Sequence, residues 1–265
     1  MGRCFDPTHR SYSGDRLWDE CQWKANAMSV GKVKPQMGEA ALVGKAVDSA
    51  VCDLIAGANP SVERLIEAEV HEEDPQAQRV WALDAMKEKA AALVTLWQRD
   101  VQPQMPQVFG TQVELHWEFE GVTYHAHPDI ILADGTIIDL KTSERRLEER
   151  RADRDFQLTY YAWGIYEVYG TIPPQVGLDG LIYANPPKDV LEWNPKATKP
   201  WYDRQRSRRL TDAIESFRVE AAKRERSRKT AQELDMHLTQ GFTAQFACNG
   251  CAVKVDCPAW RGIQE

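Results

Sequence analysis

Residues 127–143 read HPDIILADGTIIDLKTS, and this stretch decides what the rest of the chain must build. Asp139 and Lys141 are two residues apart in a predicted strand, so their side chains leave the same face of a sheet. Ile138 and Leu140 beside them are apolar, and burying charges in such a strand costs on the order of several kcal/mol unless they are paired or bind a metal. A salt bridge between Asp139 and Lys141 and a metal site are therefore the two interpretations of this pair.

Asp129 adds a second carboxylate, because it lies on the preceding strand of the same predicted hairpin. Two carboxylates that face each other repel unless a cation lies between them, and Mg²⁺ prefers oxygen ligands. A three-residue loop at 133–135, or a single bulge, places Asp129 and Asp139 on one face, whereas a two- or four-residue loop separates them. Gly135 can adopt the left-handed conformation of a three-residue loop, and Pro128 can mark a bulge. We therefore predict the register that brings the two carboxylates together.

The flanking sequence predicts helices, then strands, then helices again. Helical spacing of apolar residues predicts helices at 11–30, 38–55, 80–98 and 147–170, with a long charged helix at about 201–238. Alternating and apolar runs predict strands at 113–120, 122–132, 136–142 and 176–183. This order indicates an α/β or α+β core with a helical lobe made from both ends of the chain.

Composition and charge narrow the class of protein. Apolar residues make up 43% of the 265 residues and charged residues 28%, which is typical of a globular protein. No apolar stretch reaches the length of about 18 residues that a membrane span requires, and no apolar signal segment opens the chain. We therefore expect a cytoplasmic protein with no membrane partner.

The net charge of −7 conceals a basic segment at 199–229, where eleven Lys or Arg face five Asp or Glu. Such a segment can hold a phosphate backbone, and it can also be a salt-bridged helix face. The first interpretation makes Arg204, Arg206, Arg208 and Arg209 candidate nucleic-acid contacts.

The order of the motifs resembles the PD-(D/E)xK nuclease superfamily. Pro128 and Asp129, nine intervening residues and then D-L-K at 139–141 resemble its central motif. Gln157 and Tyr161 resemble the Q-x3-Y motif of the RecB-like branch, and at spacing i,i+4 they share one helix face. Asp48, four residues after a glycine, stands where that branch usually has histidine.

The resemblance implies a restriction-endonuclease-like core, with a mixed β-sheet flanked by helices, and metal-dependent phosphodiester hydrolysis. Asp129, Asp139 and the Leu140 carbonyl would hold Mg²⁺ or Mn²⁺. Asp48 is a further candidate ligand, and its alternative is a solvent-facing helix position. Lys141 would orient or deprotonate the attacking water.

In the same scheme Gln157 and Tyr161 would position the strand that is cut. Glu114, on the strand before the hairpin, either reaches the metal or is solvated.

Cysteines near the C-terminus indicate a second metal centre. Cys248, Cys251 and Cys257 form C-x2-C-x5-C, and in a cytosolic chain clustered cysteines more often bind metal than form disulfides. Iron–sulfur members of the RecB-like branch, which include CRISPR-associated adaptation nucleases and AddB-type subunits, take a fourth cysteine from the N-terminus. The resemblance therefore implies a [4Fe-4S] cluster with Cys21 as the fourth ligand and Cys4 as runner-up. Zinc in a Cys4 site is the alternative.

Together these features predict a DNA exonuclease that acts on single strands or DNA ends, in recombination, repair or CRISPR-adaptation-like processing with a partner protein. The alternative is a non-catalytic DNA-end binding or scaffold protein, against which the intact Asp129, Asp139 and Lys141 argue. We expect one domain over 1–265. Its nuclease core spans about 38–185, and its helical lobe, closed by the Cys4 cluster, is made of 1–37 and 199–265.

Overall fold

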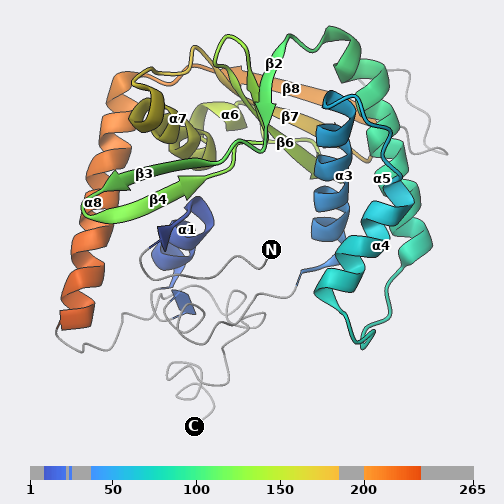
Figure 1. Cartoon of the computed structure of the whole chain (residues 1–265), viewed down its shortest axis with the longest axis horizontal. Helices are drawn as coiled ribbons and strands as arrows, with labels where there is room; N and C mark the ends of the chain where they lie inside the picture. Colours follow the sequence, from blue (N-terminus) through green and yellow to red (C-terminus); the bar gives the residue numbers. More distant parts are fainter. Residues whose placement is uncertain (1–8, 22–23, 26–36, 185–199, 234–265) are drawn as a thin grey trace.

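The computed structural model describes residues 9–21, 24–25, 37–184 and 200–233, drawn in colour in Figure 1. The helices in these ranges are α1 (Tyr12–Glu20), α3 (Glu39–Ile55), α4 (Val62–Glu73), α5 (Leu83–Leu96), α6 (Arg151–Arg154), α7 (Phe156–Tyr169) and α8 (Thr211–Glu233), with shorter turns η1 (Trp97–Val101) and η2 (Gln102–Gln104). The strands are β1 (His9–Arg10), β2 (Val108–Thr111), β3 (Leu115–Phe119), β4 (Val122–Ala126), β5 (Ile130–Leu132), β6 (Ile137–Ser143), β7 (Val176–Ile182) and β8 (Trp201–Ser207). The predicted helices at 38–55 and 80–98 are confirmed as α3 and α5.

A mixed five-stranded sheet lies at the centre, with the strand order β2-β5-β6-β7-β8. β6 and β7 run parallel, whereas the other neighbouring pairs are antiparallel. Every residue of β7 is buried, as expected for a strand covered on both faces. Figure 1 shows α3, α4 and α5 on one side of this sheet and α7 and α8 on the other. The predicted mixed sheet flanked by helices is therefore confirmed.

The predicted strand at 122–132 is wrong as a single element, because two strands of different sheets share it. β4 pairs with β3 and β1 in a small three-stranded sheet, whereas β5 pairs with β2 and β6 in the central one. Residues 127–129 make the crossing between the sheets, and Pro128 in the middle of them has no N–H to donate to either ladder.

The predicted helix at 201–238 is wrong at its start. Residues 201–207 form β8, which pairs antiparallel with β7 at the edge of the central sheet, and α8 begins only at Thr211. Charged residues suit an edge strand, where they discourage pairing with other chains, but in sequence they look like a solvated helix. The segment assigned to the helical lobe therefore contributes a strand to the core sheet.

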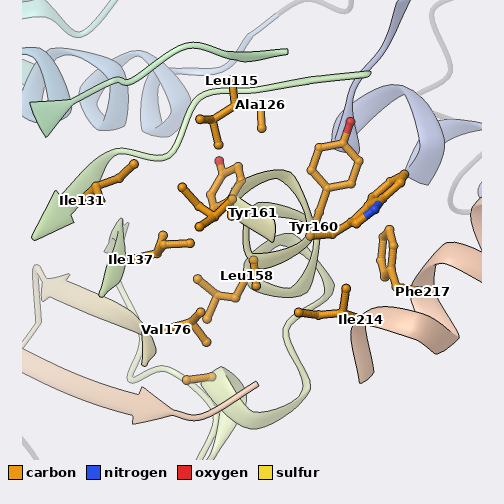
Figure 2. Close-up of a cluster of buried hydrophobic side chains, with 14 of the residues drawn as sticks. Leu115, Ala126, Ile131, Ile137, Leu158, Tyr160, Tyr161, Val176, Ile214 and Phe217 are labelled. Atoms are coloured by element: carbon orange, nitrogen blue, oxygen red, sulfur yellow. The ribbon is translucent and has the colours of Figure 1, made fainter. Parts of the chain in front are cut away.

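The two sides of the central sheet carry separate apolar cores. Ile137 of β6 packs with α7, α8 and the small sheet, and Figure 2 shows the side chains of this core around Tyr160 and Leu158. Ile138 points the other way and packs with α3, α4 and α5. Because side chains alternate along a strand, Asp139 lies on the face of Ile137, toward α7.

α8 is held by ion pairs to the N-terminal segment. Arg224 lies 2.7 Å from Asp19, and Arg228 lies 2.9 Å from Asp15. Arg10 reaches the buried Glu225 at 2.9 Å. These contacts place α1 against α8, so the two ends of the described chain lie together. None of the described helices combines the length and the apolar character needed to cross a membrane.

Candidate active site

The β5–β6 hairpin has the predicted register. Ile130 pairs with Ile138 and Ile131 with Ile137, and the loop at 133–135 is closed by hydrogen bonds between residues 132, 135 and 136. Gly135 has φ +86°, the left-handed conformation that three-residue hairpin loops favour. This register puts Asp129 opposite Asp139 on one face.

Asp129 is anchored to the neighbouring strand. Its Oδ2 accepts a hydrogen bond of 2.7 Å from the backbone N–H of Leu140. The carboxylate of Asp139 lies beside it and is only 1% exposed. The hairpin therefore buries two carboxylates side by side.

Asp48 brings a third carboxylate from α3, which packs on β6 and β2. Gly44, one turn earlier, makes this approach possible, because a Cβ there would lie only 3.0 Å from Thr142 Oγ1 on β6. The side chain of Asp48 therefore faces the sheet and not the solvent. The structure brings Asp48, Asp129 and Asp139 together.

Gln112 links two of these carboxylates. Its Nε2 donates to Asp48 Oδ2 at 2.8 Å and to Asp129 Oδ1 at 3.2 Å, and its backbone N–H donates to the Asp129 carbonyl at 2.9 Å. Gln112 has φ +49°, a left-handed conformation that non-glycine residues adopt only at a cost. Gln112 could not be recognised as a site residue from the sequence, because nothing in Thr111-Gln112-Val113 marks a left-handed turn.

The three carboxylates raise one another's pKa values. Burial is the main cause for each, and repulsion between neighbours adds to it. The pKa of Asp48 rises to about 6, and the pKa values of Asp129 and Asp139 rise to about 7. One ammonium group, that of Lys141, partly offsets these effects. The cluster is thus a buried site with an excess of negative charge.

Lys141 connects the carboxylates to α7. Its Nζ lies 2.5 Å from Asp139 Oδ2 and donates to Gln157 Oε1 at 3.0 Å, while Gln157 Nε2 donates to the Tyr161 hydroxyl at 2.6 Å. Burial alone would lower the pKa of Lys141, but the carboxylates of Asp139 and Asp129 outweigh it and raise the pKa. Lys141 therefore carries its charge at neutral pH and serves as a cation.

Gln157 and Tyr161 share the face of α7 that looks toward β6. Asp155 begins this helix, since its Oδ1 accepts from the N–H groups of Gln157 and Leu158 at 2.9 and 3.3 Å. Tyr161 is buried among apolar side chains, as Figure 2 shows, so it reaches the site through Gln157. Both residues of this predicted motif are brought to the cluster.

The three carboxylates are of the chemical type that binds a hard divalent cation, although their oxygens do not converge on one point in this structure. Among the described residues, no three Asp, Glu, His or Cys side chains already surround a common point as metal ligands. Within the same residues, Asp48 Oδ1 and Asp139 Oδ1 are nevertheless buried and have no hydrogen-bond partner. Buried carboxylate oxygens are stabilised by a cation, and carboxylates suit Mg²⁺ and Mn²⁺. In the present arrangement the carboxylates are stabilised by hydrogen bonds from the neutral Gln112 amide and by the charge of the Lys141 ammonium.

Glu114 is not brought to this cluster. Its side chain is 63% exposed and lies 2.9 Å from His116 Nε2, just before β3 in the small sheet. Its partner is His116 and not the carboxylate cluster, so the metal-ligand alternative for Glu114 is corrected and the solvated one is retained.

The four arginines predicted to contact nucleic acid have different surroundings. Arg206 lies 2.6 Å from the buried Asp179, and the buried Arg209 donates to Thr159 and to two backbone carbonyls. These two arginines hold β8 and α7 in place, which corrects the prediction for them. Arg204 and Arg208 are exposed, and Arg204 donates to the Tyr202 hydroxyl at 2.8 Å.

The predicted iron–sulfur ligands can be placed only in part. Cys248, Cys251 and Cys257 lie outside the described residues, as does Cys4. Cys21 follows α1 directly and donates its backbone N–H to the Leu17 carbonyl at 2.9 Å. The cluster therefore stays a prediction.

Comparison with known proteins agrees with this geometry. The family model described as PD-(D/E)XK nuclease superfamily matches residues 11–258. No curated protein matches the chain.

Among the solved structures that match the chain, two are similar to it over most of its length. One, from Eubacterium rectale, is described as a "Putative exonuclease"; it is 15% identical over 96% of this chain and 88% of its own, with a TM-score of 0.57, and it shows a shared fold. Another, described as SSO0001, is 14% identical over 93% of this chain and 96% of its own, with a TM-score of 0.33.

Proposed function

The chain belongs to the PD-(D/E)XK nuclease superfamily, and on that premise we propose that it is a divalent-metal-dependent exonuclease that hydrolyses DNA. The observation that carries this proposal is the buried cluster of three carboxylates beside one protonated lysine. The description of the Eubacterium rectale neighbour supports the exonuclease class. We place the activity on single strands or ends, in DNA recombination, repair or CRISPR-adaptation-like processing.

Asp129 and Asp139 would hold the metal, with Asp48 and the Leu140 carbonyl as further ligands. When bound, Mg²⁺ or Mn²⁺ supplies an activated water and polarises the scissile phosphate. Lys141 orients that water and neutralises charge that develops on the phosphate, since its raised pKa keeps it protonated.

Gln157 and Tyr161 support the position of Lys141. The Gln157 carbonyl oxygen holds the Lys141 ammonium, and the Tyr161 hydroxyl fixes the Gln157 amide. They are positioning residues, and their loss should change the placement of Lys141 more than the binding of metal.

A non-catalytic DNA-end binding protein is the weaker alternative. A binder gains affinity from cations near phosphate, whereas three buried carboxylates repel phosphate. Such a cluster is a disadvantage unless a metal completes it, which favours the enzyme.

We further propose a [4Fe-4S] cluster on Cys21, Cys248, Cys251 and Cys257. The support within the described residues is that α1, which ends beside Cys21, is joined to α8 by the ion pairs of Asp15 and Asp19. Brown protein with broad visible absorbance after anaerobic purification is the expected result. Colourless protein with stoichiometric zinc would reverse this assignment in favour of the zinc alternative.

The decisive test is cleavage of end-labelled single- and double-stranded DNA with and without Mn²⁺. We expect shortening from the ends that requires the metal and is lost in Lys141→Ala, while that variant still binds DNA. Metal-independent cleavage, or wild-type rates in Lys141→Ala, would exclude the proposed mechanism.

A further inference from the structure

A cavity of about 420 Å³ lies where the end of β6 meets the start of α7. Its walls come from Ser143 at the end of β6, the following loop with Arg146, α6, Phe156 at the start of α7, and Tyr12 of α1. The volume lies in the range of about 300–1,000 Å³ that small-ligand sites occupy.

Two residues that line the cavity are close in sequence to residues of the proposed active site. Ser143 is two residues after Lys141 on β6, and Phe156 immediately precedes Gln157, which accepts the hydrogen bond from Lys141. Tyr12, which also lines the cavity, is within electrostatic reach of the same lysine: burial and Asp155 raise the pKa of Tyr12, and Lys141 opposes that rise. The cavity therefore lies next to Lys141 and Gln157 in the fold.

The polar lining favours an anion. Three arginines line the cavity, and two of them have carboxylate partners: Arg151 lies 3.3 Å from Asp155, and Arg154 lies 2.8 Å from Glu148. Asp155 is already committed to capping α7. Arg146 is exposed and makes no ion pair with any residue in the described ranges, so its guanidinium is available to a phosphate.

The apolar lining favours a flat ring. Phe156 is 69% exposed although it stands in the wall of a cavity, so the fold does not use this side chain for packing. Aromatic side chains stack on bases of any sequence, but only where the base is unpaired. An exposed phenyl ring next to a guanidinium is thus the pair of groups that a single strand requires.

The loop that carries Arg146 is fixed before any ligand arrives. Leu147 is buried against β7, where its Cδ1 lies 2.9 Å from the position a Cβ would take at Gly180. The Ser143 hydroxyl accepts from the Arg145 N–H at 3.0 Å and donates to the Arg145 carbonyl at 2.7 Å. A preformed wall lowers the entropy cost of binding.

We propose that this cavity is a subsite for one unpaired nucleotide next to the scissile phosphate, with Phe156 stacked on the base and Arg146 on the neighbouring phosphate. The inference rests on the proposed nuclease function and deepens it, because it names the residues that would hold an unpaired nucleotide beside the site. A duplex, whose bases are already stacked, gains nothing from Phe156.

The test is binding of a fluorescein-labelled oligothymidine to the full chain in EDTA, measured by anisotropy so that cleavage does not interfere. We expect Kd to rise about 10-fold in Phe156→Ala and in Phe156→Leu, and to stay near the wild-type value in Phe156→Trp. Arg146→Ala should weaken binding and reduce its dependence on salt. Affinity for a duplex of the same length should be unchanged in the Phe156 variants.

Two controls carry the same kind of group, an exposed aromatic ring and an exposed guanidinium, but lie elsewhere. Tyr169 is 51% exposed at the far end of α7, and Arg64 is exposed on α4. Tyr169→Ala and Arg64→Ala should bind the oligothymidine as the wild type does. Absence of wild-type binding, equal losses in Tyr169→Ala and Phe156→Ala, or wild-type affinity in Phe156→Leu would overturn the subsite.

The result separates this inference from the proposed function. Cleavage by the wild type with an unchanged Kd in the Phe156 variants leaves the nuclease in place and removes the subsite. A shifted Kd in a wild-type protein that cuts nothing with Mn²⁺ leaves a single-strand binding site and removes the nuclease.

Discussion

Two groups of buried charges in this molecule differ in how they are balanced. Between α1 and α8, Glu225 accepts hydrogen bonds from Arg10 and Arg228, and Arg228 also pairs with Asp15, so two cations meet two anions. In the β5–β6 cluster three carboxylates share one lysine.

The pKa of Glu225 shifts in the opposite direction to the pKa values of Asp129 and Asp139. Burial would raise the pKa of Glu225, but its two arginines lower it, whereas the pKa values of Asp129 and Asp139 rise. Asp15, with Arg228 as its pair, keeps a raised pKa because burial outweighs that partner. A balanced group stabilises the fold, and an unbalanced one marks a site that a ligand completes.

The largest expected effect separates the two groups by activity. Asp139→Asn removes a metal ligand, and we expect metal-dependent cleavage to fall by about 10³-fold. Glu225→Gln should leave kcat within a few-fold, because it touches no part of the site. Initial rates on an end-labelled strand, with circular dichroism to confirm folding, measure both. Comparable rate losses in the two variants would remove the distinction.

The free energy of unfolding should depend strongly on Glu225, although the cleavage rate should not. Glu225→Gln leaves the half-buried Arg10 and the buried Arg228 beside a neutral amide, and breaking such a pair costs about 3 kcal/mol of unfolding free energy. Urea denaturation of the metal-free protein gives the value. As a control, Glu215→Gln on the exposed face of α8, where Glu215 pairs with Arg218, should change it by less than about 1 kcal/mol.

The pH dependence of stability should reveal the unbalanced cluster. Because the folded pKa values of Asp48, Asp129 and Asp139 are raised, the folded state binds more protons than the unfolded state between about pH 4 and 7. Metal-free stability therefore falls as the pH rises through this window, on the order of several kcal/mol in total, because each unit by which a pKa is raised corresponds to about 1.4 kcal/mol. Denaturation in EDTA at pH 5 and pH 8 measures the fall, which should be smaller in Asp139→Asn. A rise in stability over the same window in the wild type would contradict the shifted pKa values.

The same cluster shows how far sequence reasoning reaches. The hairpin register could be predicted because Gly135 and the loop length act locally, and the spacing of Asp139 and Lys141 fixes their shared face. β8 could not, because the charges of Arg204 and Arg206 fit an edge strand and a helix equally well, and only the pairing with β7 decides.

The cavity loop could not be recognised from the sequence, because its positive and negative charges are equal in number. Residues 144–155 hold five arginines and five carboxylates, so this segment has no net charge and does not read as basic. Only the fold separates Arg146 from the paired Arg151 and Arg154, which line the same cavity. Long-range placement, and not residue type, creates that asymmetry.

Metal preference should sharpen the contrast further. Histidine at position 48 would remove one negative charge and supply a nitrogen ligand, which suits Mn²⁺ better than Mg²⁺. We expect Asp48→His to raise the half-saturating Mg²⁺ concentration relative to that of Mn²⁺ by about 10-fold, and Asp48→Ala to weaken both metals. Titrations of the cleavage rate with each metal decide it. Unchanged half-saturation in Asp48→Ala would make Asp48 a structural residue of α3.

The smallest expected effect concerns Gln112, a neutral residue that stabilises the carboxylates by hydrogen bonds. Its amide donates to Asp48 and Asp129, so in EDTA at pH 8 Gln112→Ala should lose about 1 kcal/mol of stability. Gln112→Gly should lose less, because glycine relieves the left-handed backbone at φ +49°. With saturating Mg²⁺ the loss in Gln112→Ala should shrink, since the cation then offsets the repulsion between the two carboxylates. Thermal unfolding of both variants with and without Mg²⁺ is the measurement. A loss that is the same in both conditions would mean that Gln112 only holds the β2–β5 connection, and that its amide does not substitute for the metal.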